Sequence, residues 1–222
     1  FEGKPLSRLE AALPRYLQRH HWYAGKKQSI LRTKVIDVLV LRDVPKLTEY
    51  LQQQGRLRGK LPTMRILIVQ VYFVAGELET YALPVLFTEG DQAKNILGDH
   101  PSAGILRIET SEGKQAALCD TTYEVVFWLL LLDAMDRKRS IPGQRGEVLA
   151  TATEAFDKLE KIALQTVGAD TNGQPHAAAT STFWDVSFHA GDQNNSSAAF
   201  GGRFIMKLFR KLSEGENPEA EL

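Results

Sequence analysis

The sequence is poor in cysteine and carries no excess charge of either sign. Its single cysteine, Cys119, cannot form a disulfide within the chain, so nothing here requires an oxidising compartment. Lysine and arginine together number 27, as do aspartate and glutamate. A protein that reads nucleic acid usually carries a basic excess, so we exclude nucleic acid as a partner.

Long hydrophobic runs are also missing. The longest, Val125 to Leu132, has eight residues, whereas a membrane-spanning helix needs about 20. We therefore expect no membrane segment and interpret this run as the core of a buried helix. No charged stretch followed by an apolar one opens the sequence, which excludes a signal peptide on this segment. The cytoplasm is the expected location, and a start at Phe1 rather than Met is compatible with a chain that extends upstream.

What the sequence does contain is the pattern of a globular protein with helices and strands. Apolar residues make up 43% and charged residues 24%, which excludes a disordered chain. Leucines at three- and four-residue spacing predict an amphipathic first helix, in which Pro14 marks either a kink or the end. The elements expected in the first hundred residues are this helix over 6–17, a strand over 30–41, a short helix over 48–53, and a hairpin of strands over 64–74 and 77–87.

A second hairpin and a helix are expected in the middle of the chain. The hairpin comprises strands over 104–110 and 114–119. Thr121 followed three residues later by Glu124 fits a capping box, which predicts that the helix carrying the apolar run begins there. Another helical pattern covers 148–166, and the Ala-, Thr- and Gly-rich segment 166–182 is interpreted as a loop.

The last forty residues predict an ordered series of short elements. These are a strand over 183–190, a small polar loop over 191–197, extended structure over 198–200, a turn at 201–202, a strand over 203–209 and a helix beginning at Asn217. Alternation places Lys207 on the same strand face as Ile205 and Phe209. We expect Lys207 on a central strand, with its side chain directed toward the polar loop.

Strands grouped in hairpins beside separate helices indicate an α+β chain with mainly antiparallel sheets. The order of the last elements is that of the amino-terminal lobe of a protein-kinase-like fold. There, a loop of small residues lets backbone N–H groups approach phosphates, a strand lysine supplies positive charge and a helix glutamate holds that lysine. The sequence has no G-x-G-x-x-G, and a strand lysine is more often a solvated surface residue, so composition and spacing leave both interpretations of Lys207 open.

Several motifs, in the same order along the chain, resemble the maltokinase family. The family pattern E-Q-S-N-T-S-x-x-x-G, I-L-K-L-F-R-R and G-x-N-P-x-x-E is similar to segments near the end of this sequence, and two cap motifs are similar to segments near its start. The matching segments are Asp192 to Ser197 with Phe200-Gly201, Met206 to Lys211, Gly215 with Asn217 to Glu221, Arg19 to Lys26, and Tyr81 to Val85.

The resemblance implies an activity and a set of binding residues. The reaction is transfer of the γ-phosphate of ATP to the anomeric hydroxyl of maltose, with magnesium, in the glycogen and trehalose pathway. Such kinases are often fused behind a trehalose synthase, which is thus a possible fused or associated partner. The resemblance implies that the phosphate-facing loop includes Gln193, Asn194, Asn195, Ser196 and Ser197. Lys207 corresponds to the nucleotide lysine and Glu221 to its helix partner.

The resemblance also implies the division of the chain. Residues 1–100 correspond to an amino-terminal cap, 101–182 to an intermediate α+β segment, and 183–222 to the start of the kinase-like lobe. None of the five histidines lies in an H-G-D-like catalytic loop. We therefore expect the catalytic lobe, with its base and metal ligands, beyond Leu222, and we expect this chain alone to transfer no phosphate.

A second class of function stays open. Asp192, Asn194 and Gly202 replace the Glu, Ser and Asp of the family pattern. These departures are compatible with a non-catalytic cap, a docking module or a carbohydrate-binding module whose nucleotide loop has degenerated.

Four further features are predicted to be structural. Trp22 and Tyr23 are interpreted as core aromatics, with Trp22 buried between the first helix and the strand at 81–85. The neighbours His20 and His21 point apart and make a poor metal pair. Cys119 is interpreted as a packed thiol and the basic segment 137–139 as a solvated helix end.

Overall fold

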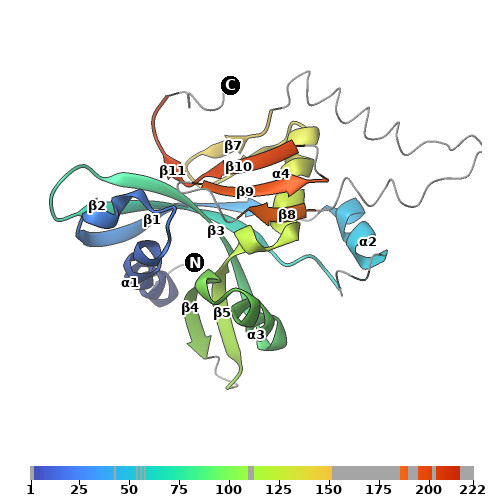
Figure 1. Ribbon diagram of the computed structural model, residues 1–222, viewed down its shortest axis with the longest axis horizontal. Coiled ribbons are helices and arrows are strands. Elements are labelled where there is room, and N and C mark those ends of the chain that lie inside the picture. The colour runs from blue at the N-terminus through green and yellow to red at the C-terminus, as the bar shows by residue number, and fades with distance from the viewer. Residues whose placement is uncertain are drawn as a thin grey trace, which may run out of the picture.

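An antiparallel sheet organises most of the molecule (Figure 1). The computed structural model describes residues 3–42, 44–53, 55, 57, 59–109, 113–151, 186–189, 195–201 and 204–215. In this part of the chain the sheet has the order β1-β2-β3-β5-β4, and β11 pairs with β3 beside that path. The strands are β1 (Ile30–Leu41), β2 (Met64–Phe73), β3 (Glu79–Glu89), β4 (Gly104–Glu109), β5 (Gln115–Asp120) and β11 (Lys211–Leu212).

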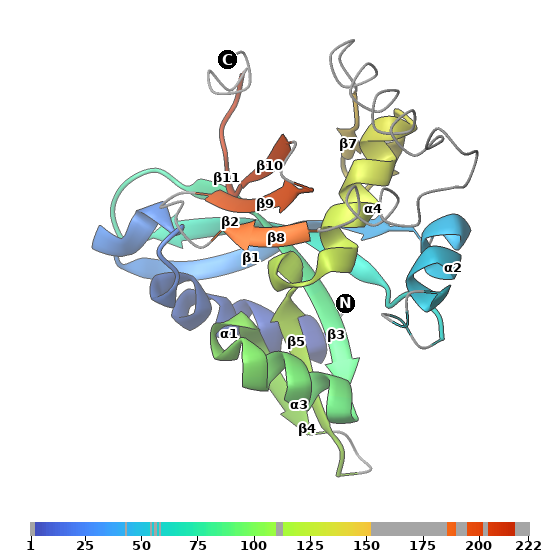
Figure 2. The ribbon, with the colours of Figure 1, turned by 45° about the vertical axis from the view of Figure 1, so that its right-hand side comes forward.

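The large sheet separates two hydrophobic cores (Figure 2). Neighbouring residues of β2 show the division, since Ile66 belongs to one core and Leu67 to the other, as the period-two alternation of a strand requires. One core lies under α1 (Lys4–Arg19), and the other lies under α4 (Val125–Asp136) and a second, smaller sheet. Strand β3 is buried on both faces because it is covered from both sides.

The amphipathic first helix predicted from the leucine spacing is confirmed as α1. Leu9, Leu13 and Leu17 are buried on its sheet-facing side, and the helix continues through Pro14 to Arg19. Trp22 is 3% exposed, and its ring centroid lies 6.2 Å from that of Tyr81 on β3. The predicted burial of Trp22 between the first helix and this strand is thus confirmed.

Both predicted hairpins are present in the large sheet. Strands β2 and β3 pair antiparallel, as do β4 and β5, and the short helix α2 (Pro45–Gln53) precedes β2. Strands β4 and β5 lie beyond the expected end of the cap at residue 100, yet they belong to its sheet, because β5 pairs with β3. Helix α3 (Gly90–Asp99) was not predicted, since its buried apolar positions are few.

The start of α4 differs from the prediction. The helix carries the expected apolar run, but its N-cap is Glu124 and not Thr121. Thr121 instead begins the 3₁₀ helix η3 (Thr121–Tyr123), whose N-cap, Asp120, accepts a hydrogen bond from the backbone N–H of Thr122. The predicted capping box is wrong because Asp120 holds this segment in a separate turn.

The helix predicted from residue 148 is wrong at its start. Residues 147–149 form β7 (Glu147–Leu149), which pairs antiparallel with β6 (Ser140–Pro142). The remainder of that prediction, and the loop predicted over 166–182, lie outside the described residues.

The smaller sheet has the order β10-β9-β8, with β8 (Val186–His189), β9 (Asn195–Phe200) and β10 (Phe204–Phe209) all antiparallel. Residues 195–197, predicted in a loop, therefore begin a strand, because each finds a pairing partner on β10. Strand β9 is central among these three and β10 lies at the edge of the part that is described, so the described strands do not place Lys207 on a central strand.

Candidate functional site

The predicted lysine and part of the predicted loop lie on adjacent strands. Lys207 on β10 is the register partner of Ser197 on β9. Directly opposed residues of an antiparallel pair project to the same face, so Lys207 and Ser197 share one face of the small sheet. Gln193, Asn194 and Glu221 lie outside the described residues. The orientation of Lys207 toward the start of the loop, and its pairing with Glu221, stay predictions.

The face that carries Lys207 is only partly open to solvent. Ile205 lies two residues earlier on the same strand and is 58% exposed. Its register partner on β9 is Ala199, which in turn is the partner of Ser187 on β8. Lys207 and Ser187 are exposed, and Ser197 is buried. This face therefore presents small and apolar side chains beside a lysine.

The opposite face of the small sheet is closed. Ala198 and Phe200 are 0% exposed, and Met206 is 8% exposed. All three belong to the core that also contains α4. Within the described residues the small sheet packs on the core by this face, whereas on the other face Lys207 and Ile205 are exposed and Ser197 is buried.

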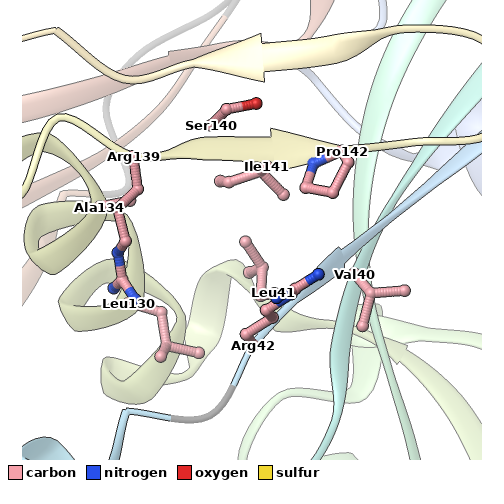
Figure 3. Close-up of a pocket in the computed structure, with 9 residues that line it drawn as sticks. All are labelled: Val40, Leu41, Arg42, Leu130, Ala134, Arg139, Ser140, Ile141 and Pro142. Atoms are coloured by element: carbon pink, nitrogen blue, oxygen red, sulfur yellow. The ribbon is translucent and has the colours of Figure 1, made fainter.

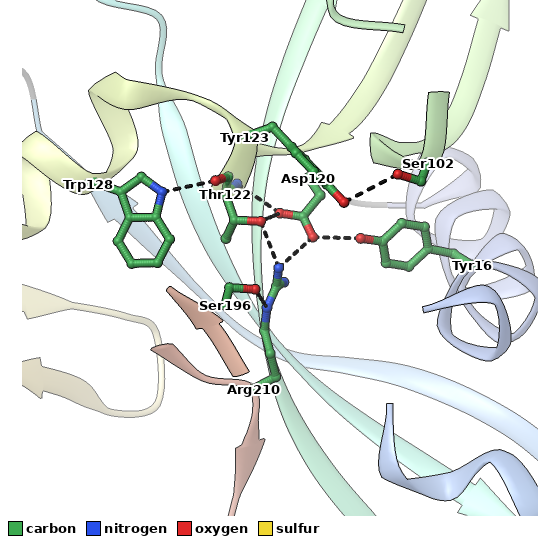
Figure 4. A network of polar contacts seen from close by, with 8 residues as sticks. All are labelled: Tyr16, Ser102, Asp120, Thr122, Tyr123, Trp128, Ser196 and Arg210. Atoms are coloured by element: carbon green, nitrogen blue, oxygen red, sulfur yellow. Dashed lines mark hydrogen bonds and ion pairs between the residues drawn. The ribbon is translucent and has the colours of Figure 1, made fainter. Parts of the chain in front are cut away.

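Ser196, one of the predicted loop residues, belongs to the closed side. Its hydroxyl oxygen accepts a hydrogen bond of 3.0 Å from Nε of Arg210 (Figure 4). Arg210 follows β10 directly and is 1% exposed. Asn195 is the register partner of Phe209, and Ser196 is the register partner of Leu208. Asn195 and Ser196 therefore belong to a paired strand and not to a loop.

Arg210 forms a buried ion pair with Asp120 at the end of β5. Its Nη2 lies 2.8 Å from Oδ2 of Asp120, and the two side chains are 1% and 0% exposed. The same nitrogen donates to Oγ1 of Thr122 at 2.8 Å. The guanidinium lies over the ring of Trp22, 4.5 Å from its centroid, a cation–π contact.

Asp120 accepts further hydrogen bonds from two other segments. The hydroxyl of Tyr16 on α1 donates to its Oδ2 at 2.6 Å. Thr122 donates from its backbone N–H at 2.9 Å and from its hydroxyl at 2.8 Å, both to Oδ1. Burial opposes the charged form of Asp120, but Arg210 and these donors together hold its pKa below the usual value. Asp120 is therefore an ionised carboxylate in the interior.

Tyr16 and His20 are the other titratable groups of this cluster. Burial raises the pKa of Tyr16 well above its usual value, and the neighbouring Asp120 raises it further. Burial lowers the pKa of His20, an effect that Asp120 opposes and Arg210 reinforces. His20 is 4% exposed, whereas His21 is exposed, which confirms that the neighbours point apart.

Two side chains of this cluster could not be selected from the sequence. Arg210 lies inside a segment that resembles the maltokinase pattern, but alternation and charge give no reason to bury it. Asp120 ends an apolar strand and precedes two threonines. This position is the only feature of the sequence that hints at a buried carboxylate. Their partnership depends on strands that are distant in the chain.

Cys119 and the glycine of the cap motif have structural roles. Cys119 is 1% exposed and burial raises its pKa to about 11, which confirms a packed thiol rather than a nucleophile. A Cβ atom on Gly25 would lie 2.5 Å from the hydroxyl oxygen of Tyr23 and 3.0 Å from the ring of Phe73. Only glycine leaves room for these aromatic rings.

An open pocket of about 360 Å³ lies between β1, α4 and β6 (Figure 3). Its lining is mainly apolar, with Leu41, Leu130 and Ile141 among its residues. Arg139 also lines it and forms an ion pair with Asp133, so the basic segment at the end of α4 is not simply solvated. None of the predicted site residues lines this pocket.

Comparison with known proteins adds no assignment, since neither a known protein-family model nor a curated protein sequence matches the chain. Within the described residues, no helix has the length and apolar character that crossing a membrane requires. The same residues contain no cluster of three or more His, Cys, Asp or Glu side chains suited to a metal ion.

Proposed function

We propose that this chain is the cap and nucleotide-binding part of an ATP-dependent maltokinase, which transfers phosphate from ATP to maltose in the cytoplasm. The observation that carries the proposal is the register of the small sheet, which opposes the exposed Lys207 to Ser197. Maltose as acceptor, and trehalose synthase as a fused or associated partner, rest on the resemblance of the sequence motifs.

ATP is proposed to bind along the exposed part of the sheet face that carries Lys207. The exposed Ile205 and its half-buried register partner Ala199 are proposed to contact the base, since aliphatic side chains commonly line such sites. Lys207 lies two residues further along β10 than Ile205, a separation of about 6.6 Å in a strand. A lysine at that position supplies positive charge to the phosphates. Residues 193–197 are proposed to approach the same phosphates, with Glu221 holding the lysine.

Magnesium is the second cofactor that the resemblance implies. No cluster of three or more His, Cys, Asp or Glu side chains in the described part of the chain could hold the ion. The proposal assigns the metal ligands to the catalytic lobe that the resemblance implies, and to none of the described residues.

The test is ATP binding to the purified chain, measured by titration calorimetry, with Lys207→Ala as the variant. Loss of a charge-assisted contact to phosphate is expected to weaken binding about tenfold or more. Lys34→Ala is the matched control, because Lys34 is also an exposed strand lysine but lies on β1 of the large sheet. Equal affinities of the two variants would contradict the role of Lys207.

One observation favours the second candidate, a non-catalytic docking or carbohydrate-binding module. Residues 195–197 stand in a strand, and the Ser196 hydroxyl is bonded to Arg210, which leaves fewer of the predicted loop groups for phosphate. If the parent chain binds maltose or longer α-glucans in the same titration but not ATP, this second function replaces the first.

A further inference from the structure

Arg210 stands where the chain crosses from the small sheet to the large one. Strand β10 ends at Phe209 and β11 begins at Lys211, so Arg210 is the whole connection. Its carbonyl oxygen accepts a hydrogen bond of 2.7 Å from the backbone N–H of Ala82 on β3. Lys211 is then the register partner of Tyr81. Because no linker separates the sheets here, a displacement of β10 has to displace Arg210.

The side chain of Arg210 connects the same two sheets a second time. Nε donates to Ser196 on β9, while Nη2 donates to Asp120 at the end of β5. Figure 4 shows the guanidinium between these two partners. One planar group thus fixes the central strand of the small sheet to a carboxylate of the large sheet, with the fixed fork geometry of a guanidinium.

Burial makes this connection costly to break. Both charges are almost fully enclosed, and separating a buried pair leaves an uncompensated charge in the interior. The small sheet is therefore held in one position relative to the cap. Its two strands next to Arg210 carry the nucleotide candidates: Lys207 lies three residues before Arg210 on β10, and Ser197 follows Ser196 on β9.

We propose that Arg210, anchored by Asp120 and Tyr16 of the cap, is the positioning residue that holds β9 and β10 and so places Lys207 opposite Ser197. The effect on nucleotide rests on the proposed function, whereas the anchoring of the two strands does not. Tyr16 is connected to Arg210 by hydrogen bonds through Asp120 Oδ2, and its ring centroid also lies 6.2 Å from that of Trp22, whose ring the guanidinium covers.

The experiment compares Tyr16→Phe with Tyr72→Phe by hydrogen exchange and mass spectrometry of the purified chain. Each change removes one hydroxyl; that of Tyr72 donates to Gln70 at 2.8 Å on β2 and does not touch Asp120. Exchange at 195–200 and 204–209 is expected to rise about tenfold in Tyr16→Phe and to stay at the parent rate in Tyr72→Phe. No rise, or a uniform rise over all described strands, overturns the proposal.

A double-mutant cycle separates positioning from simple loss of stability. Ser196→Ala removes the acceptor of Arg210 Nε, and the hydrogen bonds that connect Ser196 with Tyr16 run through Arg210 and Asp120. The effects of Ser196→Ala and Tyr16→Phe on strand exchange are therefore expected to be non-additive, whereas those of Ser196→Ala and Tyr72→Phe add. Additivity in both cycles overturns the proposal.

ATP titration of the same variants links the anchor to the nucleotide. If the proposed function holds, Tyr16→Phe weakens ATP binding several-fold, although Tyr16 belongs to the cap. A parent chain that binds no ATP refutes the proposed function, and the exchange data still decide whether Arg210 anchors the strands.

Discussion

Two buried carboxylates, Asp120 and Asp37, attach different parts of the molecule to the large sheet. Asp120 is held mainly by side chains, those of Arg210, Tyr16 and Thr122, together with one backbone N–H, that of Thr122. Asp37 on β1 is held by backbone, since its two oxygens accept hydrogen bonds of 2.6–3.0 Å from the N–H groups of 144–146 in the turn between β6 and β7. The first attaches the small sheet, and the second attaches a hairpin.

The same balance of forces keeps both carboxylates ionised. Burial opposes the charge in each, but Arg210 at Asp120 and the backbone N–H groups at Asp37 hold both pKa values below the usual value. The two carboxylates differ in what they require of the sequence around them. Asp120 needs particular side chains from separate segments, whereas Asp37 needs a turn that comes close, and a Cβ atom on Gly143 would lie 2.5 Å from its Oδ2.

The largest effect is expected from Asp120→Asn. The change leaves Arg210 charged and buried without its counter-ion, so the free energy of unfolding falls by about 3–5 kcal/mol, measured by urea denaturation. Because the pKa of Asp120 is lowered in the fold, its stabilisation is present above the ordinary pKa of about 3.9 and is lost as the pH falls through the folded pKa. The stability of the Asp120→Asn variant is therefore expected to lack this dependence on pH.

The matched control for Asp120 removes both charges together. A variant with Asp120→Leu and Arg210→Met leaves no unpaired buried ion, so it is expected to unfold at a higher urea concentration than Asp120→Asn. If the double variant is no more stable than the single one, the unpaired charge is not the cause of the loss.

A smaller and more local effect is expected from Asp37→Asn. An amide has one acceptor oxygen where the carboxylate has two, so part of the bonding to 144–146 is lost, at a cost of about 1–3 kcal/mol. Hydrogen exchange is expected to rise in β6 and β7 and to stay unchanged in β9 and β10. Equal rises in both places would show that the two attachments are not separate.

The smallest effect concerns His20, which lies beside the Asp120 cluster. Burial lowers its pKa in the fold, so below the ordinary value of about 6.5 the unfolded chain binds the proton more readily. Stability therefore falls as the pH drops from about 6.5 toward the folded pKa. In His20→Gln this contribution to the fall of stability with pH is expected to disappear. Urea denaturation across the same pH range measures it.

The difference between local and distant contacts also explains which elements could be predicted from the sequence. Helix α1 and the hairpin of β2 and β3 have strong local periodicity, and both are confirmed. The short strand β7 has three residues, too few for a pattern, and it forms because β6 lies beside it. Residues 195–197 were predicted in a loop from their polarity, but pairing with β10 draws them into a strand.

The residues of the candidate site also differ in whether a local pattern or distant pairing brings them together. Lys207 and Ser197 were selected from a local resemblance, and the register of β9 and β10 decides that they oppose each other. Arg210 and Asp120 are separated by 90 residues, and no local pattern connects them. Their pairing requires β5 and the end of β10 to meet at β3, which is a property of the whole sheet.

Local patterns of apolar residues were enough to predict α1, the apolar run of α4, the hairpins β2–β3 and β4–β5 and the α+β class, because alternation and helical periodicity are set by the backbone geometry of each segment. The tertiary structure decided which polar groups became buried. Burying an ion is favourable only where a partner and further donors already surround it, and those groups come together only when distant strands have joined one sheet.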